Sequence, residues 1–469
     1  MSNTSKQATV TKLNGPAPLP GGLLDLASLG YIEEEYILSG EANSYALTSE
    51  RTADGKWSAK PDRFAPYVTR FTVRRPIDPA RFSGTVAVEW NNVSGGVDMS
   101  PDWTLLHRHH IRRGDIHIGV TAQKVGVDGG GLVEGLHLKK ISPERYGTLS
   151  HPGDAWSFDI YSQVGAILRD PAKSPFGAMS PQRLIAIGES QSAIHLITYI
   201  NAIDSIARVF DGFFVHGRGT AGASLEGMFR ISGGGDVATL INQAKPERIR
   251  EDSRVPVLVL QSETDVVTLG GGRPHQLDGP RLRLWEISGA AHADTYLVAA
   301  GSFDDGRLSP ERFAELLKPT TQLPFGVTNS PINAGPQQHY VGQAAFEALD
   351  RWVRGGAAPA VAGRLGLSSD RSGCELDGNG NALGGVRTPW VDAPTTVLSG
   401  MGQGGGVFGF LFGTTKPIDT AKMANLYPGG KKDYIARFTA SLDNAIAKGF
   451  LLSADRDEII AVASAAFPA

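Results

Sequence analysis

The hydrophobic pattern of the chain changes near residue 100. Before that point, apolar runs separated by charged or Gly- and Pro-containing loops predict strands over Glu35–Leu47, Ala65–Arg75 and Gly84–Trp90. Beyond it, short apolar runs alternate with stretches in which apolar residues recur at helical spacing. The opening of the chain is therefore predicted to be all-β, and the part that follows to alternate strand and helix.

The alternating part has recognisable helix starts and stops. Ser100-Pro101 offers a hydroxyl cap followed by proline in the first turn, and Gly114 offers the stop. Asp154 can cap a second helix with one apolar stripe. Repeated β-α order predicts right-handed crossovers and a mostly parallel sheet with helices on both faces. Its further strands are expected over Ile116–Ala122, Val209–Val215, Val255–Gln261 and Arg281–Ile287.

One stretch, Arg183–Tyr199, combines a strand, a tight turn and a helix. The turn reads Gly-Glu-Ser-Gln-Ser, with Ser190 at its centre and the small residues Gly188 and Ser192 two positions to either side. A serine in such a turn has its Oγ lifted above the carboxyl end of the sheet. An ordinary strand-to-helix connection with a surface serine is the alternative, because five-residue patterns recur by chance.

The pattern also predicts how the chain divides. Residues 1–30 are rich in Pro, Gly, Ser and Thr and are expected to form a flexible lead. Residues 31–355 are expected to form the α/β core. Cap insertions near 217–254 and 299–338 would interrupt that core. Residues 356–469 would form a C-terminal extension packed on it, since no flexible linker precedes them.

Composition excludes several classes of function. The 469 residues are 41% hydrophobic and 20% charged, with a formal net charge of −3, as expected of an ordinary globular protein. So small a charge predicts neither nucleic-acid binding nor attraction to an anionic membrane. A single cysteine, Cys374, excludes an intrachain disulfide. Because no secretion signal or long apolar run is seen, a cytoplasmic location is expected.

The most apolar short run is Gly406–Gly413, which is too short to span a bilayer. We expect it to be buried, and the alternatives are an exposed lid or a contact between subunits of a homo-oligomer. No nucleic-acid or membrane partner is expected.

Two later strands end in residues that can activate a serine. Val255–Gln261 leads into Ser-Glu-Thr-Asp, and Arg281–Ile287 is followed five residues later by His292. The carboxyl ends of parallel strands meet at one edge of the sheet, where ligands bind. The order serine, acid, histidine is that of the α/β-hydrolase triad. Each piece alone has an ordinary explanation, but together they predict a nucleophile, an acid and a base.

In this hypothesis His292 accepts the Ser190 proton and returns it to the leaving alkoxide, while an acid orients the imidazole. Asp265 is favoured for the acid, since it lies deeper along its loop, and Glu263 is the competitor. The oxyanion would be bound by the backbone N–H of Gln191 and by a second N–H from the glycine-rich loop after Gly84–Trp90. Val93 or a neighbour is the expected second donor.

No metal or cofactor site is predicted. His107, His109 and His110 lie on one expected helix, but no carboxylate or cysteine stands at a suitable spacing to complete a metal site. The glycine runs lack the strand before and the helix after that a phosphate-binding loop requires.

The elbow IGESQSA, the acid loop QSETDV, the histidine loop WEISGAAHAD and the tail GGVRTPWVDAP…LYP resemble the large bacterial α/β-hydrolase-domain family of carboxylesterases. The resemblance runs from about residue 30 to the C-terminus. It implies an α/β-hydrolase fold, serine ester hydrolysis without a cofactor, Ser190 as nucleophile and His292 as base. A macrocyclic lactone such as zearalenone is conceivable as substrate. Ser192 replaces the final glycine of the common G-x-S-x-G pattern, and serine is small enough to fit there.

The residues leave the exact reaction open. The leading hypothesis is a carboxylesterase or lactonase acting on a small, moderately apolar molecule. Acyl transfer and amide or thioester hydrolysis pass through the same acyl-enzyme. A non-catalytic binding protein with a hydrolase fold is the remaining alternative, although it would have no need of an intact Ser190, Asp265 and His292.

Overall fold

The computed structural model describes residues 8–18, 22–131, 133–227, 243–324, 326–405 and 408–468. The chain forms two compact units. The N-terminal unit comprises Met1–Val257 and Pro274–Leu282, and the C-terminal unit comprises Leu258–Arg273 and Arg283–Ala469. Part of the cap expected near 217–254 and the start of the run Gly406–Gly413 lie outside the described residues.

The N-terminal unit contains a mixed sheet in which strands follow the order β1-β2-β3-β5-β4-β6-β7. β1, β2, β3 and β5 pair antiparallel, whereas β5, β4, β6 and β7 pair parallel. The expected parallel sheet is confirmed for these last four strands. The strands are β1 (Thr9–Leu13), β2 (Tyr31–Leu47), β3 (Ala59–Pro76), β4 (Thr85–Trp90), β5 (Ile116–Val120), β6 (Arg183–Glu189) and β7 (Gly212–His216).

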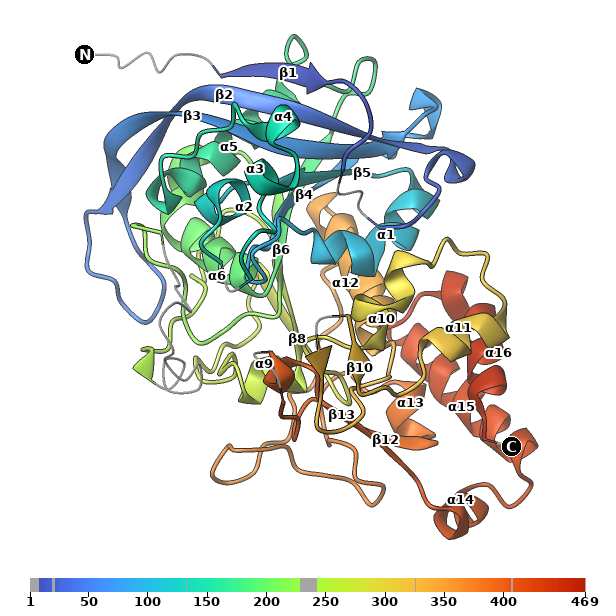
Figure 1. Ribbon diagram of the computed structural model, residues 1–469. Helices are drawn as coiled ribbons and strands as arrows, with labels where there is room; N and C mark the ends of the chain where they lie inside the picture. Colours follow the sequence, from blue (N-terminus) through green and yellow to red (C-terminus); the bar gives the residue numbers. More distant parts are fainter. Residues whose placement is uncertain are drawn as a thin grey trace. The chain divides into compact units, whose positions relative to one another are not determined.

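The long antiparallel pair of β2 and β3 extends beyond the predicted strands. In Figure 1 it forms a curved blue ribbon, with β1 alongside β2. β1 corrects the expectation that residues 1–30 are a flexible lead, because Thr9–Leu13 pairs along its length with β2. Its polar composition gave no strand signal, and the long partner edge that it covers is fixed only by the fold.

Helices cover both faces of this sheet, as predicted. Successive side chains of a strand point to opposite faces. At the end of β4, Glu89 accepts hydrogen bonds from the start of α1, whereas the ring of Trp90 contacts aromatic side chains of α5 and α6. The helices of the unit are α1 (Pro101–Arg113), α2 (Lys124–Asp128), α3 (Leu138–Ile141), α4 (Pro143–Tyr146), α5 (Ser157–Arg169), α6 (Gln191–Thr198) and α7 (Asp204–Ala207).

The start of α1 differs from its prediction in one respect. Gly114 ends the helix in a left-handed conformation, as expected, with φ of 80°. Ser100, however, does not cap it and donates its hydroxyl to Asn91 Oδ1 instead. The carboxylate of Glu89 replaces it, accepting the N–H groups of Asp102 and Trp103 at 2.9 and 3.0 Å. A buried strand residue therefore binds the N–H groups that a local cap usually satisfies.

The C-terminal unit contains nearly all of β8 (Val257–Ser262) and β9 (Leu282–Ile287), which are neighbouring strands. Its helices are α9 (Glu263–Val267), α10 (Thr295–Val298), α11 (Pro310–Leu316), α12 (Gln337–Val353), α13 (Pro389–Asp392), α14 (Thr420–Leu426), α15 (Lys431–Ala447) and α16 (Arg456–Ala466). Its short strands are β10 (Gln322–Leu323), β11 (Gly326–Val327), β12 (Thr396–Ser399) and β13 (Thr414–Pro417).

Residues after 355 contact β9 within this unit. The Val386 N–H donates to Glu286 O at 2.6 Å, and the Phe450 ring packs edge-on against Trp285 at 5.0 Å. The region 299–338 contains α11, β10 and β11 rather than a single compact element. Across the described ranges, no helix has the length and apolar character needed to cross a membrane.

Candidate active site

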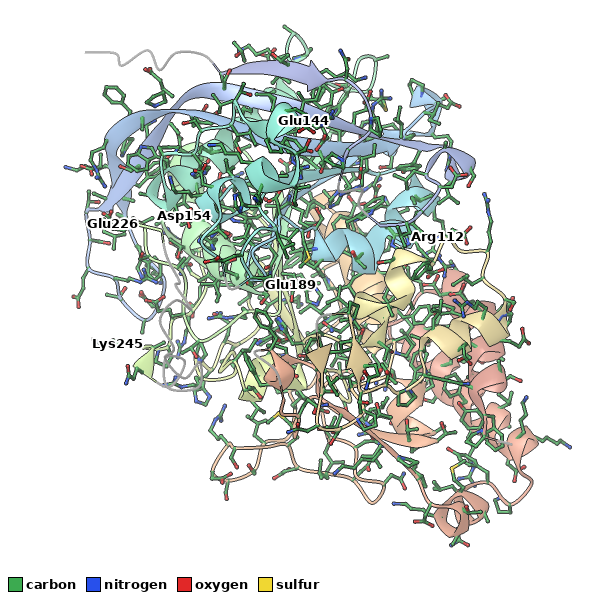
Figure 2. All side chains as sticks on the ribbon, viewed as in Figure 1. Arg112, Glu144, Asp154, Glu189, Glu226 and Lys245 are labelled. Atoms are coloured by element: carbon green, nitrogen blue, oxygen red, sulfur yellow. The ribbon has the colours of Figure 1, made fainter. Side chains whose placement is uncertain are left out.

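The turn between β6 and α6 holds Ser190 in a strained conformation. All of β6 after its first residue is buried, and Glu189, labelled in Figure 2, is its last residue. Ser190 has φ of 61° and ψ of −118°, a region that costs energy for any residue with a Cβ. Its N–H donates to His216 O at 2.9 Å, and its carbonyl accepts from the Ile194 N–H at 3.1 Å. This is the geometry of a nucleophile elbow.

The two small residues around Ser190 face each other. A Cβ added at Gly188 would lie 2.9 Å from Ser192 Cβ and 3.2 Å from Leu196 Cδ1. Ser192 is itself fully buried. The turn therefore leaves no room for a larger side chain at Gly188, while serine fits in place of the usual second glycine.

The loop after β4 lies against the elbow. Asn92 Nδ2 donates to Glu189 O at 3.1 Å and to Glu189 Oε2 at 3.2 Å. The Val93 N–H donates to Gln191 Oε1 at 3.4 Å. This places the backbone N–H of Val93 beside the first turn of α6, which begins with Gln191. The side-chain amide of Gln191, to which the sequence assigned no part, thus accepts the Val93 N–H.

The acid and the histidine pair within the C-terminal unit. His292 Nδ1 lies 2.5 Å from Asp265 Oδ1, and both side chains are buried. The other carboxylate oxygen of Asp265 accepts from the N–H and hydroxyl of Ser262, at 2.6 and 2.8 Å. With Nδ1–H donated to the carboxylate, a neutral imidazole carries its acceptor lone pair on Nε2, as a general base requires.

Residues with no predicted role hold this pair in place. Thr264 Oγ1 accepts from the His292 N–H at 3.1 Å, and Gln338 Nε2 donates to His292 O at 3.0 Å. Ser262 and Asp265 form a reciprocal capping box at the start of α9. The Ser-x-x-acid spacing of that box was readable in the sequence, with aspartate in place of the usual glutamate. Gln338 lies on α12 and carries no such local signal.

Glu263 serves a different set of partners. Its carboxylate accepts from the N–H groups of Gly289 and Gly400, at 2.6 and 2.8 Å, and from the Ser399 hydroxyl at 3.2 Å. Burial raises the pKa of Glu263 to about 7, against the opposing effect of these donors. Of the two candidate acids, Asp265 is thus the one bonded to His292, while Glu263 ties the histidine loop to residues near 400.

The candidate residues form two groups. Ser190, Gln191 and Val93 come together in the N-terminal unit, and Asp265 and His292 come together in the C-terminal unit, with Glu263 beside them.

The histidines of α1 have structural partners. His110 Nδ1 pairs with Asp115 Oδ2 at 3.1 Å, and His107 Nδ1 lies 3.0 Å from Thr104 O. In the part of the chain that the structure describes, no group of three or more His, Cys, Asp or Glu side chains could hold a metal ion.

The chain matches the α/β-hydrolase domain family over residues 3–461. It belongs to that family. A comparison with curated proteins found no match. In α/β-hydrolases the nucleophile follows a strand in a sharp turn to a helix, and acid and histidine come later in the chain. The order Ser190, Asp265, His292 follows this pattern.

Similar solved structures include an esterase of Rhizomucor miehei, with 10% identity and a TM-score of 0.30 over 61% of this chain and 86% of that one. An α/β serine hydrolase without a lid from Xanthomonas campestris has 11% identity and a TM-score of 0.26 over 60% and 83%. An α/β-hydrolase of Vibrio vulnificus has 11% identity and a TM-score of 0.27 over 47% and 72%.

Exchanging each acid for its amide distinguishes the two carboxylates of the acid loop. If Asp265 orients His292 as the acid of a catalytic triad, Asp265→Asn should lower kcat by about 10⁴-fold, because an amide facing Nδ1 favours the wrong histidine tautomer. Glu263→Gln should mainly lower the unfolding midpoint, because it weakens bonds to Gly289 and Gly400. Steady-state kinetics and thermal unfolding of both variants test this. Equal losses of kcat would contradict the assignment.

Glu263 should also make stability depend on pH. Its pKa is raised from 4.5 to about 7, so between these values the folded state holds a proton that the unfolded state has lost. The contribution of Glu263 to the free energy of unfolding should therefore fall as pH rises through this window, by up to about 3 kcal/mol.

Urea unfolding at pH 4.5 to 7.5 measures this effect. The stability of wild type relative to Glu263→Gln should decrease with rising pH, because glutamine does not titrate. Asp457→Asn, at a side chain that is 99% exposed, is the matched control and should show no such trend. A constant difference between wild type and Glu263→Gln would show that burial does not perturb this carboxyl.

Proposed function

We propose that the protein is a serine hydrolase that cleaves a carboxylic ester or lactone of a small apolar molecule through an acyl-enzyme on Ser190. The observation that carries the proposal is the buried hydrogen bond between Asp265 and His292, which follow β8 and β9 in the chain. In a catalytic triad a buried acid holds the histidine in the orientation that a base needs. An ordinary surface loop does not require such a buried pair.

In the proposed reaction Ser190 Oγ attacks the carbonyl carbon while His292 Nε2 takes its proton. The N–H groups of Gln191 and Val93 would bind the oxyanion of the tetrahedral intermediate. His292 then returns the proton to the alkoxide as its bond to the carbonyl carbon breaks. A water molecule that His292 deprotonates attacks the acyl-enzyme, and the carboxylic acid and free Ser190 are released. Asp265 accepts the Nδ1–H of His292 and stabilises the imidazolium. The chemistry needs no cofactor.

The side chain of Gln191 must move during this cycle. Its Oε1 accepts the Val93 N–H, so a substrate oxygen has to replace it there. The long distance of 3.4 Å indicates a weak bond that is readily exchanged.

Replacing the nucleophile is the direct test. Ser190→Ala should lower kcat/KM for a p-nitrophenyl acyl ester by roughly 10³-fold or more and abolish labelling by a serine-directed phosphonate. Ser192→Ala is the matched control, because this second serine of the turn is buried, and it should keep both labelling and turnover. Retained turnover in Ser190→Ala, or a label on another residue, would refute the proposal.

The pH dependence of kcat/KM provides an independent check. A protonated imidazole cannot accept the serine proton, so activity should decrease as the pH is lowered and His292 becomes protonated. Turnover of a neutral ester in buffers from pH 4.5 to 8 measures this dependence. A flat profile would argue against a histidine base.

Acyl transfer remains the second candidate, because it uses the same acyl-enzyme. Adding an alcohol acceptor and measuring how product divides between acid and new ester separates the two reactions. Esters and macrocyclic lactones of graded size then define the substrate.

A further inference from the structure

A cluster of acid and histidine side chains lies beneath the elbow in the N-terminal unit, and the proposed chemistry does not use it. Its members are Glu89 on β4, Asp102 on α1, His117 on β5 and His216 on β7, of which none is more than 1% exposed. Burying ionisable groups is costly unless they are hydrogen-bonded to one another or to the backbone. The bonds that compensate this cost lead to the backbone around Ser190.

The first link joins α1 to the nucleophile. His216 Nδ1 lies 2.8 Å from Asp102 Oδ1, and His216 O accepts the Ser190 N–H at 2.9 Å. His216 is the last residue of β7, and it pairs in register with Glu189, the last residue of β6. The side-chain bond to Asp102 therefore fixes the end of β7, and the backbone carbonyl at that end accepts the N–H of the strained Ser190.

The second link joins α1 to the loop that carries Val93. Both oxygens of Glu89 accept N–H groups from the first turn of α1, including that of Asp102 itself. His117 Nε2 lies 2.7 Å from Glu89 Oε2, and Arg74 donates to His117 Nδ1 at 3.1 Å. Since an arginine can only donate, His117 presents its Nε2–H to Glu89. Val93 follows Glu89 by four residues, and its N–H donates to Gln191 in the first turn of α6.

Electrostatics couples the two carboxyls. Burial raises the pKa of Glu89 well above its ordinary value, and the neighbouring charge of Asp102 raises it further. Burial also raises the pKa of Asp102, against the opposing bond from His216. Burial and the nearby Arg74 charge lower the pKa of His117, which remains neutral and a donor to Glu89. The cluster is thus held by directed bonds rather than by a simple ion pair.

We infer that Asp102 and His216 are positioning residues, which set the backbone donors of the oxyanion site through the Ser190 N–H bond and the Glu89 contacts. This inference rests on the proposed function, since it assumes attack by Ser190. Oxyanion donors act only when they are aimed at the developing charge, so a small displacement of Gln191 or Val93 weakens binding of the transition state and leaves substrate binding nearly intact.

Two variants break the Asp102–His216 bond from opposite sides. Asp102→Ala removes the acceptor, and His216→Phe removes the ring donor while keeping the ring shape and the backbone carbonyl that holds Ser190. Both should lower kcat by roughly 10- to 100-fold with KM nearly unchanged. Asp102→Asn should restore most of the loss, because its amide oxygen can still accept from His216 Nδ1–H.

The decisive readout is inhibition by a trifluoromethyl ketone, which forms a tetrahedral adduct with a catalytic serine. Its affinity should fall by the same factor as kcat in Asp102→Ala and His216→Phe, whereas inhibition by the product acid should stay near the wild-type value. A merely destabilised protein would not separate these two inhibitors, because a smaller folded fraction lowers every signal alike.

Asp115→Ala is the matched control. Asp115 pairs with His110 at the opposite end of α1 and is equally buried, so its loss should lower stability without lowering affinity for the ketone. Equal losses of ketone affinity in Asp115→Ala and Asp102→Ala would overturn the inference. Wild-type affinity in a folded Asp102→Ala or His216→Phe would overturn it as well, and His216→Phe decides the matter if Asp102→Ala does not fold.

Phosphonate labelling separates this inference from the proposed function. Labelling of Ser190 in wild type together with unchanged ketone affinity in the variants would refute the positioning role alone. Failure of wild type to label at Ser190 would refute the proposed function itself.

Discussion

The left-handed backbone of Ser190 is the constraint on which the arrangement of the candidate residues in the N-terminal unit depends. A non-glycine residue at φ 61° costs about 1–3 kcal/mol, so its surroundings must hold it there. The bond from its N–H to His216 O on β7 holds it in this conformation, and so does the close packing of Gly188 against Ser192. Because the turn is sharp, the loop after β4 can approach it and place Val93 beside Gln191.

Buried acidic side chains fix loops and helix starts within each of the two units. Glu89 accepts two N–H groups of α1, Asp265 accepts the Ser262 N–H, and Glu263 accepts N–H groups from Gly289 and Gly400. Loop and helix-start N–H groups lack partners of their own, so a carboxylate recovers there part of the cost of leaving water. The groups that are expensive to bury are thus the ones that fix the loops.

Several local features were predictable because their cause is local. Pro101 and Gly114 bound α1, and the alternation of strands and helices gave the parallel part of the sheet. Other features were not, because their partners lie far along the chain. Glu89 replaces Ser100 as the cap of α1, and Thr9–Leu13 forms a strand only because the edge of β2 is there to pair with it.

The sequence by itself determined the strand-turn-helix around Ser190 and the order of serine, acid and histidine along the chain, since residue type and spacing along one strand or helix suffice for both. It could not separate Glu263 from Asp265, which lie two residues apart in one loop. The tertiary structure separated their environments: Asp265 bonds to His292, and Glu263 to Gly289 and Gly400. The partner of a buried carboxylate depends on which distant segments of the chain the fold places beside it. The residues next to it in the sequence do not determine that.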